Sequence, residues 1–243
     1  MNLILVAHGT RRPGGVAMIG DLAAHVGVLV NRTVQVAFVD VLGPTPSEVL
    51  SPAAATGRPA IVLPAFLSRG YHVRTDLPAH VAASGHPDVT VTPALGLSPQ
   101  IVRIVGEQMV ESGWRPSDSV ILAAAGTSDR TARADLHTTA TLLSALIGSR
   151  VELAFAAGEP RVHEAVAHAR RRGARRVVVA SYLLADGLFQ DRLRNSGADL
   201  VSDPLGTNLR LVRLVASRFS RASRWCPQWS HTPRQYRCRY PGG

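Results

Sequence analysis

The sequence predicts an α/β fold with two four-stranded parallel sheets, one in each half of the chain, related by internal duplication. Two observations lead to this prediction. Short aliphatic runs alternate with longer segments whose apolar residues recur at helical spacing, which is typical of parallel βαβ units with right-handed crossovers. The order of these segments in the first half then recurs in the second half.

The duplication can be followed residue by residue. Gly126 and Thr127 repeat Gly9 and Thr10 at an offset of 117 residues. The same offset relates three further pairs, namely Val34 and Val151, Ala37 and Ala154, and Phe38 and Phe155. A fixed internal period of this kind indicates two copies of one structural unit.

The repeat predicts three regions and the elements within them. Residues 1–115 form the half that carries the candidate active site, residues 116–221 form a degenerate copy, and residues 222–243 form an arginine-rich tail that we expect to be disordered. Strands are expected at residues 3–7, 34–39, 60–66, 89–92, 120–124, 151–156, 177–182 and 200–201. Helices are expected at 16–30, from Pro44, after Asp76, and at 101–110, 131–147, 160–172, 188–195 and 208–220.

The composition limits the classes of partner. All 27 basic residues are arginine, against 17 acidic residues, which gives a formal net charge of +10. Six arginines and no acid lie in residues 218–243, so the rest of the chain has 21 arginines against 17 acids and the charge gives little support to nucleic-acid binding. No apolar run reaches the ~20 residues of a membrane span. Cys226 and Cys238 both lie in the tail, so we expect a cytoplasmic protein without a disulfide framework, membrane partner or nucleic-acid partner.

The polar residues at the ends of the predicted strands of the first half are the candidates for chemistry. His8 follows the first strand, Asp40 the second, and His72 lies beyond the third. The carboxyl ends of parallel strands meet at one edge of a sheet, where ligands bind. Two imidazoles and a carboxylate suit a divalent first-row metal. The alternative is that His8 only hydrogen-bonds a neighbouring loop, but its replacement by Ala125 in the second copy favours a function.

Several charged residues near these strand ends have structural alternatives. Asp76 precedes Leu77-Pro78, where capping of the following helix is favoured over catalysis. Four arginines lie in the same loops and form either a solvated surface or a rim for a polycarboxylate, which arginine binds with two parallel hydrogen bonds. These are Arg11, Arg12, Arg69 and Arg74. The arginine-rich run at 170–176 is better explained by a helix C-terminus than by a nucleic-acid patch.

The segments around these residues resemble the sirohydrochlorin-type metal chelatases, in a long tandem form. The likeness rests on Ala7-His8-Gly9-Thr10-Arg11, on Val36 to Asp40, and above all on the stretch from Leu63-Pro64-Ala65-Phe66-Leu67 through Gly70-Tyr71-His72 to Asp76-Leu77-Pro78. The resemblance covers residues 1 to about 220. It implies two Rossmann-like halves and an enzyme that inserts a divalent metal into a tetrapyrrole without ATP. Asp40 stands where such enzymes usually have a glutamate.

The resemblance implies a role for each candidate residue. His8 and His72 match the family's metal-binding histidines and would also be catalytic, with Asp40 as a third metal ligand. With such a substrate, we expect the four arginines to pair with its carboxylates. We expect Fe2+ or Co2+ as substrate, no tightly bound cofactor, sirohydrochlorin as the tetrapyrrole, and a monomer that contains its own pseudo-dimer. The product would enter sirohaem or cobalamin biosynthesis. The alternatives are a non-catalytic metal or tetrapyrrole carrier, and a histidine phosphatase, whose arginine before the histidine is replaced here by Ala7.

Overall fold

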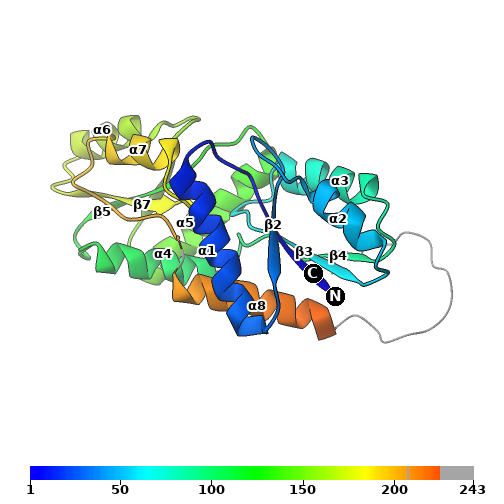
Figure 1. Cartoon of the computed structure of the whole chain (residues 1–243). Coiled ribbons are helices and arrows are strands. Elements are labelled where there is room, and N and C mark those ends of the chain that lie inside the picture. Colours follow the sequence, from blue (N-terminus) through cyan, green and yellow to red (C-terminus); the bar gives the residue numbers. More distant parts are fainter. Residues whose placement is uncertain (207, 225–243) are drawn as a thin grey trace. The chain divides into compact units, whose positions relative to one another are not determined.

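The chain folds into the predicted α/β architecture (Figure 1). The computed structural model describes residues 1–206 and 208–224, so the predicted tail lies outside the described residues from residue 225 onward. Two four-stranded sheets are present, with strand orders β2-β1-β3-β4 and β6-β5-β7-β8. Every strand pair in them is parallel, which confirms the predicted fold class.

The elements follow the predicted order with small differences at their ends. In the first half they are β1 (Asn2–Ala7), α1 (Pro13–Val30), β2 (Val34–Phe38), α2 (Pro46–Ala54), β3 (Ala60–Pro64), the π-helix η1 (His72–Asp76), α3 (Leu77–Ala83), β4 (Val89–Val91) and α4 (Pro99–Glu111). In the second half they are β5 (Ser119–Ala124), α5 (Arg130–Ile147), β6 (Val151–Phe155), α6 (Val162–Arg171), β7 (Val177–Tyr182), α7 (Leu188–Arg194), β8 (Leu200–Val201) and α8 (Leu209–Arg224). The helix expected from Pro44 begins at Pro46, because Thr45 and Glu48 form a capping box there.

The register of the two sheets shows that the offset of 117 residues is structural. Leu3 pairs with Val34 and with Ile61 in the first sheet. In the second sheet, the residues 117 positions later form the same pairs, Val120 with Val151 and with Val178. The two copies therefore share one strand framework, on which different side chains stand.

The contacts within the chain divide it into two compact units that do not coincide with the two sequence halves. Unit 1 contains Met1–Phe66, Tyr71–Leu95 and the described residues from Val212 onward. Unit 2 contains Leu67–Gly70 and Gly96–Leu211. Each half therefore contributes its last helix, in whole or in large part, to the unit of the other half, and a short segment of the first half also belongs to unit 2.

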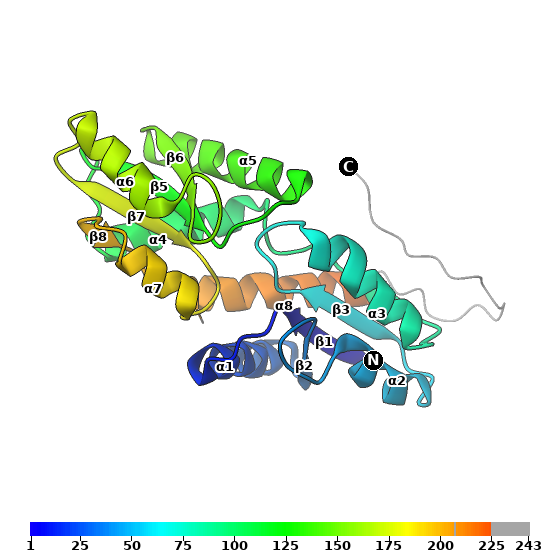
Figure 2. The ribbon, with the colours of Figure 1, turned by 90° about the horizontal axis from the view of Figure 1, so that it is seen from above.

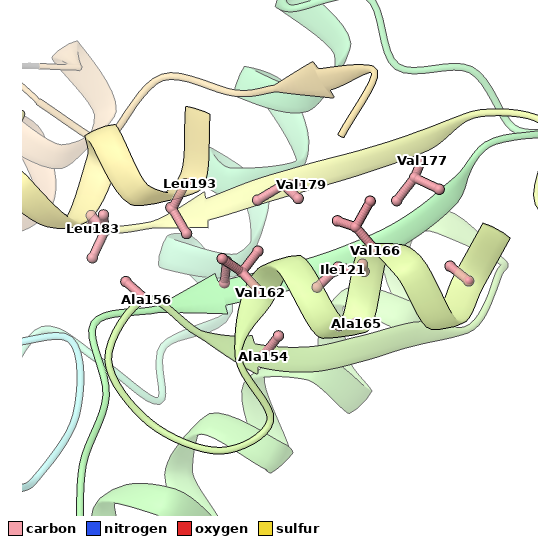
Figure 3. Close-up of a cluster of buried hydrophobic side chains, with 12 residues drawn as sticks. Ile121, Ala154, Ala156, Val162, Ala165, Val166, Val177, Val179, Leu183 and Leu193 are labelled. Carbon is pink, nitrogen blue, oxygen red and sulfur yellow. The ribbon is translucent and has the colours of Figure 1, made fainter. Parts of the chain in front are cut away.

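Each unit has an apolar core between its sheet and a pair of helices. In unit 1, α2 and α3 lie side by side (Figure 2), and Leu50 and Leu77 from these helices pack against Ile4, Val6 and Val62 of the sheet. In unit 2, α6 and α7 pack on the strands through buried side chains (Figure 3). The cluster includes Ile121, Ala154, Val162, Val166, Val177, Val179 and Leu193. Strands buried on both faces explain the nearly continuous aliphatic runs in the sequence.

Helix α1 is strongly apolar, although the sequence has no uninterrupted apolar run of the length of a membrane span. Its 18 residues have a mean hydropathy of 1.5, which is enough by length and composition to cross a membrane. In this structure one side of α1 is buried within unit 1, through Ile19, Leu22, Ala23 and Val26. Of this apolar window, 28% is buried inside the protein.

Candidate metal site

Three neighbouring strands of the first sheet bring the candidate ligands together. His8 follows β1 directly, Asp40 comes two residues after the end of β2, and His72 opens η1 after β3. Since β1 lies between β2 and β3 and all three run parallel, their carboxyl ends meet at one edge of the sheet. All three residues belong to unit 1.

The side chains of His8, Asp40 and His72 form a cluster with the geometry of a metal site. One ligand atom from each residue lies within 4.8 Å of the others. The two imidazole rings meet edge to face, with centroids 4.6 Å apart and an angle of 86° between their planes. In residues 1–206 and 208–224 this is the one such group of three or more His, Cys, Asp or Glu residues. Two nitrogens and one carboxylate oxygen form a donor set that accepts divalent first-row metals.

A glycine allows the loops that carry His8 and Asp40 to approach each other. The backbone N–H of Asp40 donates to the carbonyl of His8 at 3.0 Å. Gly9 has φ of 99°, and a Cβ placed there would lie 2.2 Å from the carbonyl oxygen of Asp40. A side chain at position 9 would therefore force the two ligand loops apart.

The backbone next to Asp40 fixes its carboxylate. Val41 has φ of 69°, a left-handed conformation that a β-branched residue rarely adopts. In this conformation its N–H donates to Oδ1 of Asp40 at 2.7 Å. Oδ2 takes no part in this hydrogen bond and is the candidate ligand atom of Asp40. The shorter side chain of aspartate thus reaches the two histidines at this position.

Asp76 holds the ring of His72, and the expectation that Asp76 caps a helix is wrong. Asp76 has helical dihedral angles at the start of α3 and its side chain accepts no capping hydrogen bond. Instead its Oδ2 lies 2.6 Å from Nδ1 of His72. The two residues lie at the ends of η1, where the N–H of Leu77 donates to the carbonyl of His72. Single π-helical turns are frequent at functional sites.

A groove of about 500 Å³ runs from Asp40 and His72 along α3. Asp40, His72, Asp76 and His80 contribute its polar lining. Nδ1 of His80 lies 3.1 Å from the hydroxyl of Ser47, which leaves its Nε2 as the remaining ring nitrogen. His80 and the His72–Asp76 pair were not predicted, although the spacing of four residues from His72 to Asp76 to His80 is a sequence signal for a shared helix face.

The structure separates the four candidate arginines into two groups. Arg11, Arg12 and Arg74 are exposed and lie in unit 1, in the loop after β1 and in η1. Arg69 lies in unit 2, where its guanidinium binds the buried carboxylate of Asp135 through Nε and Nη2 at 3.0 and 2.8 Å. This hydrogen bond is the main cause of the raised pKa of Arg69. Arg69 therefore already has a carboxylate partner within the protein.

The second copy keeps the backbone of the site and lacks its ligands. The N–H of Ala157 donates to the carbonyl of Ala125 at 2.8 Å, as Asp40 does to His8. Gly126 has φ of 131°, and a Cβ there would lie 1.8 Å from the carbonyl oxygen of Ala157. At the offset of 117, the positions of His8, Asp40, His72 and Asp76 are occupied by Ala125, Ala157, Phe189 and Leu193. All four replacements are apolar, so this framework offers no metal ligand.

The arginine-rich run at 170–176 lies at a helix end, as expected. Helix α6 ends at Arg171, and Gly173 follows with φ of 89°. Three arginines of the run are in ion pairs, Arg170 with Asp199, Arg172 with Glu152 and Arg176 with Asp118. Three of the five arginines in this run are thus paired with acidic residues of the same fold.

Comparisons with known proteins identify the family of the chain. A cobaltochelatase of Methanothermobacter thermautotrophicus that acts on sirohydrochlorin is 28% identical over 130 residues, which are 45% of this chain and 90% of that protein. The sirohydrochlorin ferrochelatase of Priestia megaterium is 26% identical over 215 residues, 83% of this chain and 79% of that protein. The structure of SirB from Bacillus subtilis with Fe3+ has a TM-score of 0.77 at 19% identity, covering 90% of this chain and 95% of that chain, which shows a shared fold. The sequence profile of the CbiX family matches residues 2–112 and again residues 119–222. The chain belongs to the CbiX family, with one copy of the family domain in each half.

Proposed function

We propose that this protein is a sirohydrochlorin chelatase that inserts Fe2+ or Co2+ into the tetrapyrrole without ATP. The observation that carries the proposal is the cluster of His8, Asp40 and His72 at the edge of the first sheet. The names of two curated relatives, a cobaltochelatase and a ferrochelatase, support the reaction and both metals. Imidazole and carboxylate accept either metal. We further propose that the enzyme acts in the cytoplasm as a monomer, without a tightly bound cofactor, in sirohaem or cobalamin biosynthesis.

The ligand atoms follow from the hydrogen bonds of the rings. Nδ1 of His8 donates to the carbonyl of Gly9 at 3.2 Å, and Nδ1 of His72 donates to Asp76 at 2.6 Å. Both rings then present a lone pair at Nε2. These two Nε2 atoms and Oδ2 of Asp40 would bind the incoming metal on one side and leave the other side for the pyrrole nitrogens. The ion is a substrate, held only until it is transferred.

Insertion exchanges one divalent ion for two pyrrole N–H protons, so the site must also accept protons. When the metal moves from the imidazoles to the ring nitrogens, each Nε2 regains a free lone pair next to a departing proton. His8 and His72 would therefore act first as ligands and then as bases. His80 lines the same groove and offers a further imidazole along the way to solvent.

The arginines supply charge for the carboxylates of the tetrapyrrole. Arg11 and Arg12 follow His8 by three and four residues, and Arg74 lies within η1 between His72 and Asp76. Each is exposed, and the guanidinium group pairs with carboxylates through two N–H groups. Arg69 is a weaker candidate for this role, because Asp135 already occupies its guanidinium.

The deciding experiment mixes the full-length protein with sirohydrochlorin and Fe2+ or Co2+ and follows the absorbance change of the macrocycle. Many turnovers per protein indicate an enzyme, whereas a single stoichiometric change indicates the carrier alternative. His8→Ala and His72→Ala should each abolish turnover with the fold intact. His25→Ala is the matched control, because His25 is exposed on α1 of the same unit and away from the cluster. Unchanged turnover in His8→Ala would remove His8 from the mechanism.

The phosphatase alternative loses support from the position of Ala7. In the histidine phosphatases that the sequence resembles at this point, an arginine precedes the histidine. Here Ala7 is 4% exposed and pairs within β1 against Phe38. A long cationic side chain has no room at this position of the sheet.

A further inference from the structure

The loop that leads into His72 is held by unit 2. The segment Leu67–Gly70 joins β3 to η1, yet it belongs by its contacts to unit 2, whereas Phe66 before it and Tyr71 after it belong to unit 1. His72 comes two residues after Gly70. The backbone immediately before this metal ligand is thus placed by contacts with the degenerate half.

The strongest of these contacts is the one between Arg69 and Asp135. Asp135 lies on α5 with its side chain 3% exposed. Its Oδ2 accepts from the backbone N–H and from Nε of Arg69, both at 3.0 Å, and its Oδ1 accepts from Nη2 of Arg69 at 2.8 Å. One buried carboxylate therefore fixes both the main chain and the side chain at position 69.

Two further contacts hold the same segment. The hydroxyl of Tyr182 donates to the carbonyl of Leu67 at 3.0 Å. Burial raises the pKa of Tyr182 to about 12, so the phenol stays protonated and remains a donor. Gly96 lies so close that a Cβ there would be 1.9 Å from the carbonyl oxygen of Leu67. The segment is therefore bound by side chains from α5 and β7 and by the backbone at Gly96.

The contacts of Asp135 with Arg69 and of Tyr182 with Leu67, here called the anchor, are absent from the other copy. At the offset of 117, Met18 stands in place of Asp135, Ala65 in place of Tyr182, and Asp186 in place of Arg69. The corresponding loop of the second half leads to Phe189, which has no ligand to position. The anchor thus exists only for the loop that leads to a metal ligand.

We propose that Asp135 is a positioning residue, which fixes His72 by holding Arg69 and the loop before it. The proposal rests on the role of His72 as a metal ligand given above. His72 comes only three positions after Arg69, at most about 11 Å of extended chain, so a shift at position 69 passes directly to the imidazole. It also gives the degenerate half a function, since that half supplies the anchor while lacking ligands of its own.

The test compares three full-length variants with the wild type, first without tetrapyrrole and then in the turnover assay with sirohydrochlorin. Asp135→Asn removes the charge of the anchor, and Arg69→Gln shortens its partner while keeping a donor. The matched control is Asp118→Asn. Asp118 is also buried in unit 2, with its side chain 2% exposed, and binds Arg176 at 2.7 Å and the N–H of Arg115 at 2.8 Å. It differs in lying just before β5, away from the Leu67–Gly70 segment. The readouts are the ¹⁵N–¹H signals of the His72 imidazole and the affinity for Co2+.

The two anchor variants should shift or broaden the His72 signals, and the control should not. Co2+ affinity should fall about tenfold in both, the lower end of the effect of partners that hold metal ligands. Wild-type His72 signals and Co2+ affinity in folded Arg69→Gln would overturn the proposal, and this milder variant decides the matter if Asp135→Asn does not fold. A higher KM for sirohydrochlorin with His72 unchanged would likewise overturn it and assign Arg69 to substrate binding. If the wild type inserts no metal while the His72 signals respond to the anchor variants, the proposed function fails and the positioning role stands.

Discussion

Nδ1 of His72 and Oδ2 of Asp76 are joined by a hydrogen bond of 2.6 Å across one π-helical turn. A carboxylate can only accept, so Nδ1 carries the proton and Nε2 carries the lone pair. This is the arrangement by which proteins fix the tautomer and the orientation of metal-binding histidines. The pair explains how a half-exposed imidazole can be held ready for a metal.

Replacing Asp76 should weaken metal binding without removing a ligand. In Asp76→Asn the amide can present its NH2 group to Nδ1 and so stabilise the wrong tautomer. We expect Co2+ affinity to fall about ten- to a hundredfold, as for other carboxylates behind metal-bound histidines. Titration with Co2+, followed by its visible absorbance, measures the change.

The control for this variant is Asp21→Asn, because Asp21 is an exposed carboxylate on α1 of the same unit. It changes the net charge of the protein equally. Equal Co2+ affinities for the two variants would show that Asp76 acts only through its charge.

Gly9 and Gly126 form a matched pair for testing the framework of the site. A Cβ would lie 2.2 Å from the carbonyl oxygen of Asp40 in one case and 1.8 Å from that of Ala157 in the other. Both Gly9→Ala and Gly126→Ala should lower the free energy of unfolding, by at least about 1–3 kcal/mol each for the left-handed φ. Urea denaturation measures this loss.

Metal binding should separate the two glycine variants. Gly9→Ala moves His8 away from Asp40 and should weaken Co2+ binding in the folded protein. Gly126→Ala strains a copy without ligands and should leave Co2+ binding as in the wild type. Full Co2+ affinity in folded Gly9→Ala would mean that the close approach of the two loops is not needed for the site.

Tyr182 should make the protein sensitive to alkaline pH. Burial raises its pKa from 10 to about 12. Between these values the phenol is ionised in the unfolded chain and protonated in the fold, so the unfolded chain binds fewer protons and stability falls as pH rises. The loss is on the order of 3 kcal/mol when complete. Tyr182→Phe removes it, so the decline in unfolding free energy from pH 9 to 11 should be smaller than in the wild type.

Tyr71→Phe is the control for this pH dependence, because the side chain of Tyr71 is 59% exposed. Its free energy of unfolding, measured with urea, should fall with pH as that of the wild type does. If Tyr182→Phe shows the same decline as Tyr71→Phe, ionisation of Tyr182 is not the cause of the alkaline loss.

The sequence by itself determined the architecture and the positions of the three candidate metal ligands. Short aliphatic runs such as Ile61 to Leu63 are typical of buried strands, and their alternation with helical segments favours parallel sheets. Parallel strands end at one edge, so residues following β1, β2 and β3 had to approach one another. For this reason the sequence alone predicts that His8, Asp40 and His72 lie close together.

Only the tertiary structure decided how those ligands are held. The role of Asp76 depends on a π-helical turn, whereas its position before Leu77-Pro78 has the sequence pattern of a helix cap. The role of Arg69 depends on Asp135, a partner 66 residues away in the chain, and no local pattern predicts such a contact. The ends of the strands follow from the alternation of strand and helix segments, which can be seen in the sequence. Hydrogen bonds between side chains from different elements are set by packing, and packing exists only once the chain has folded.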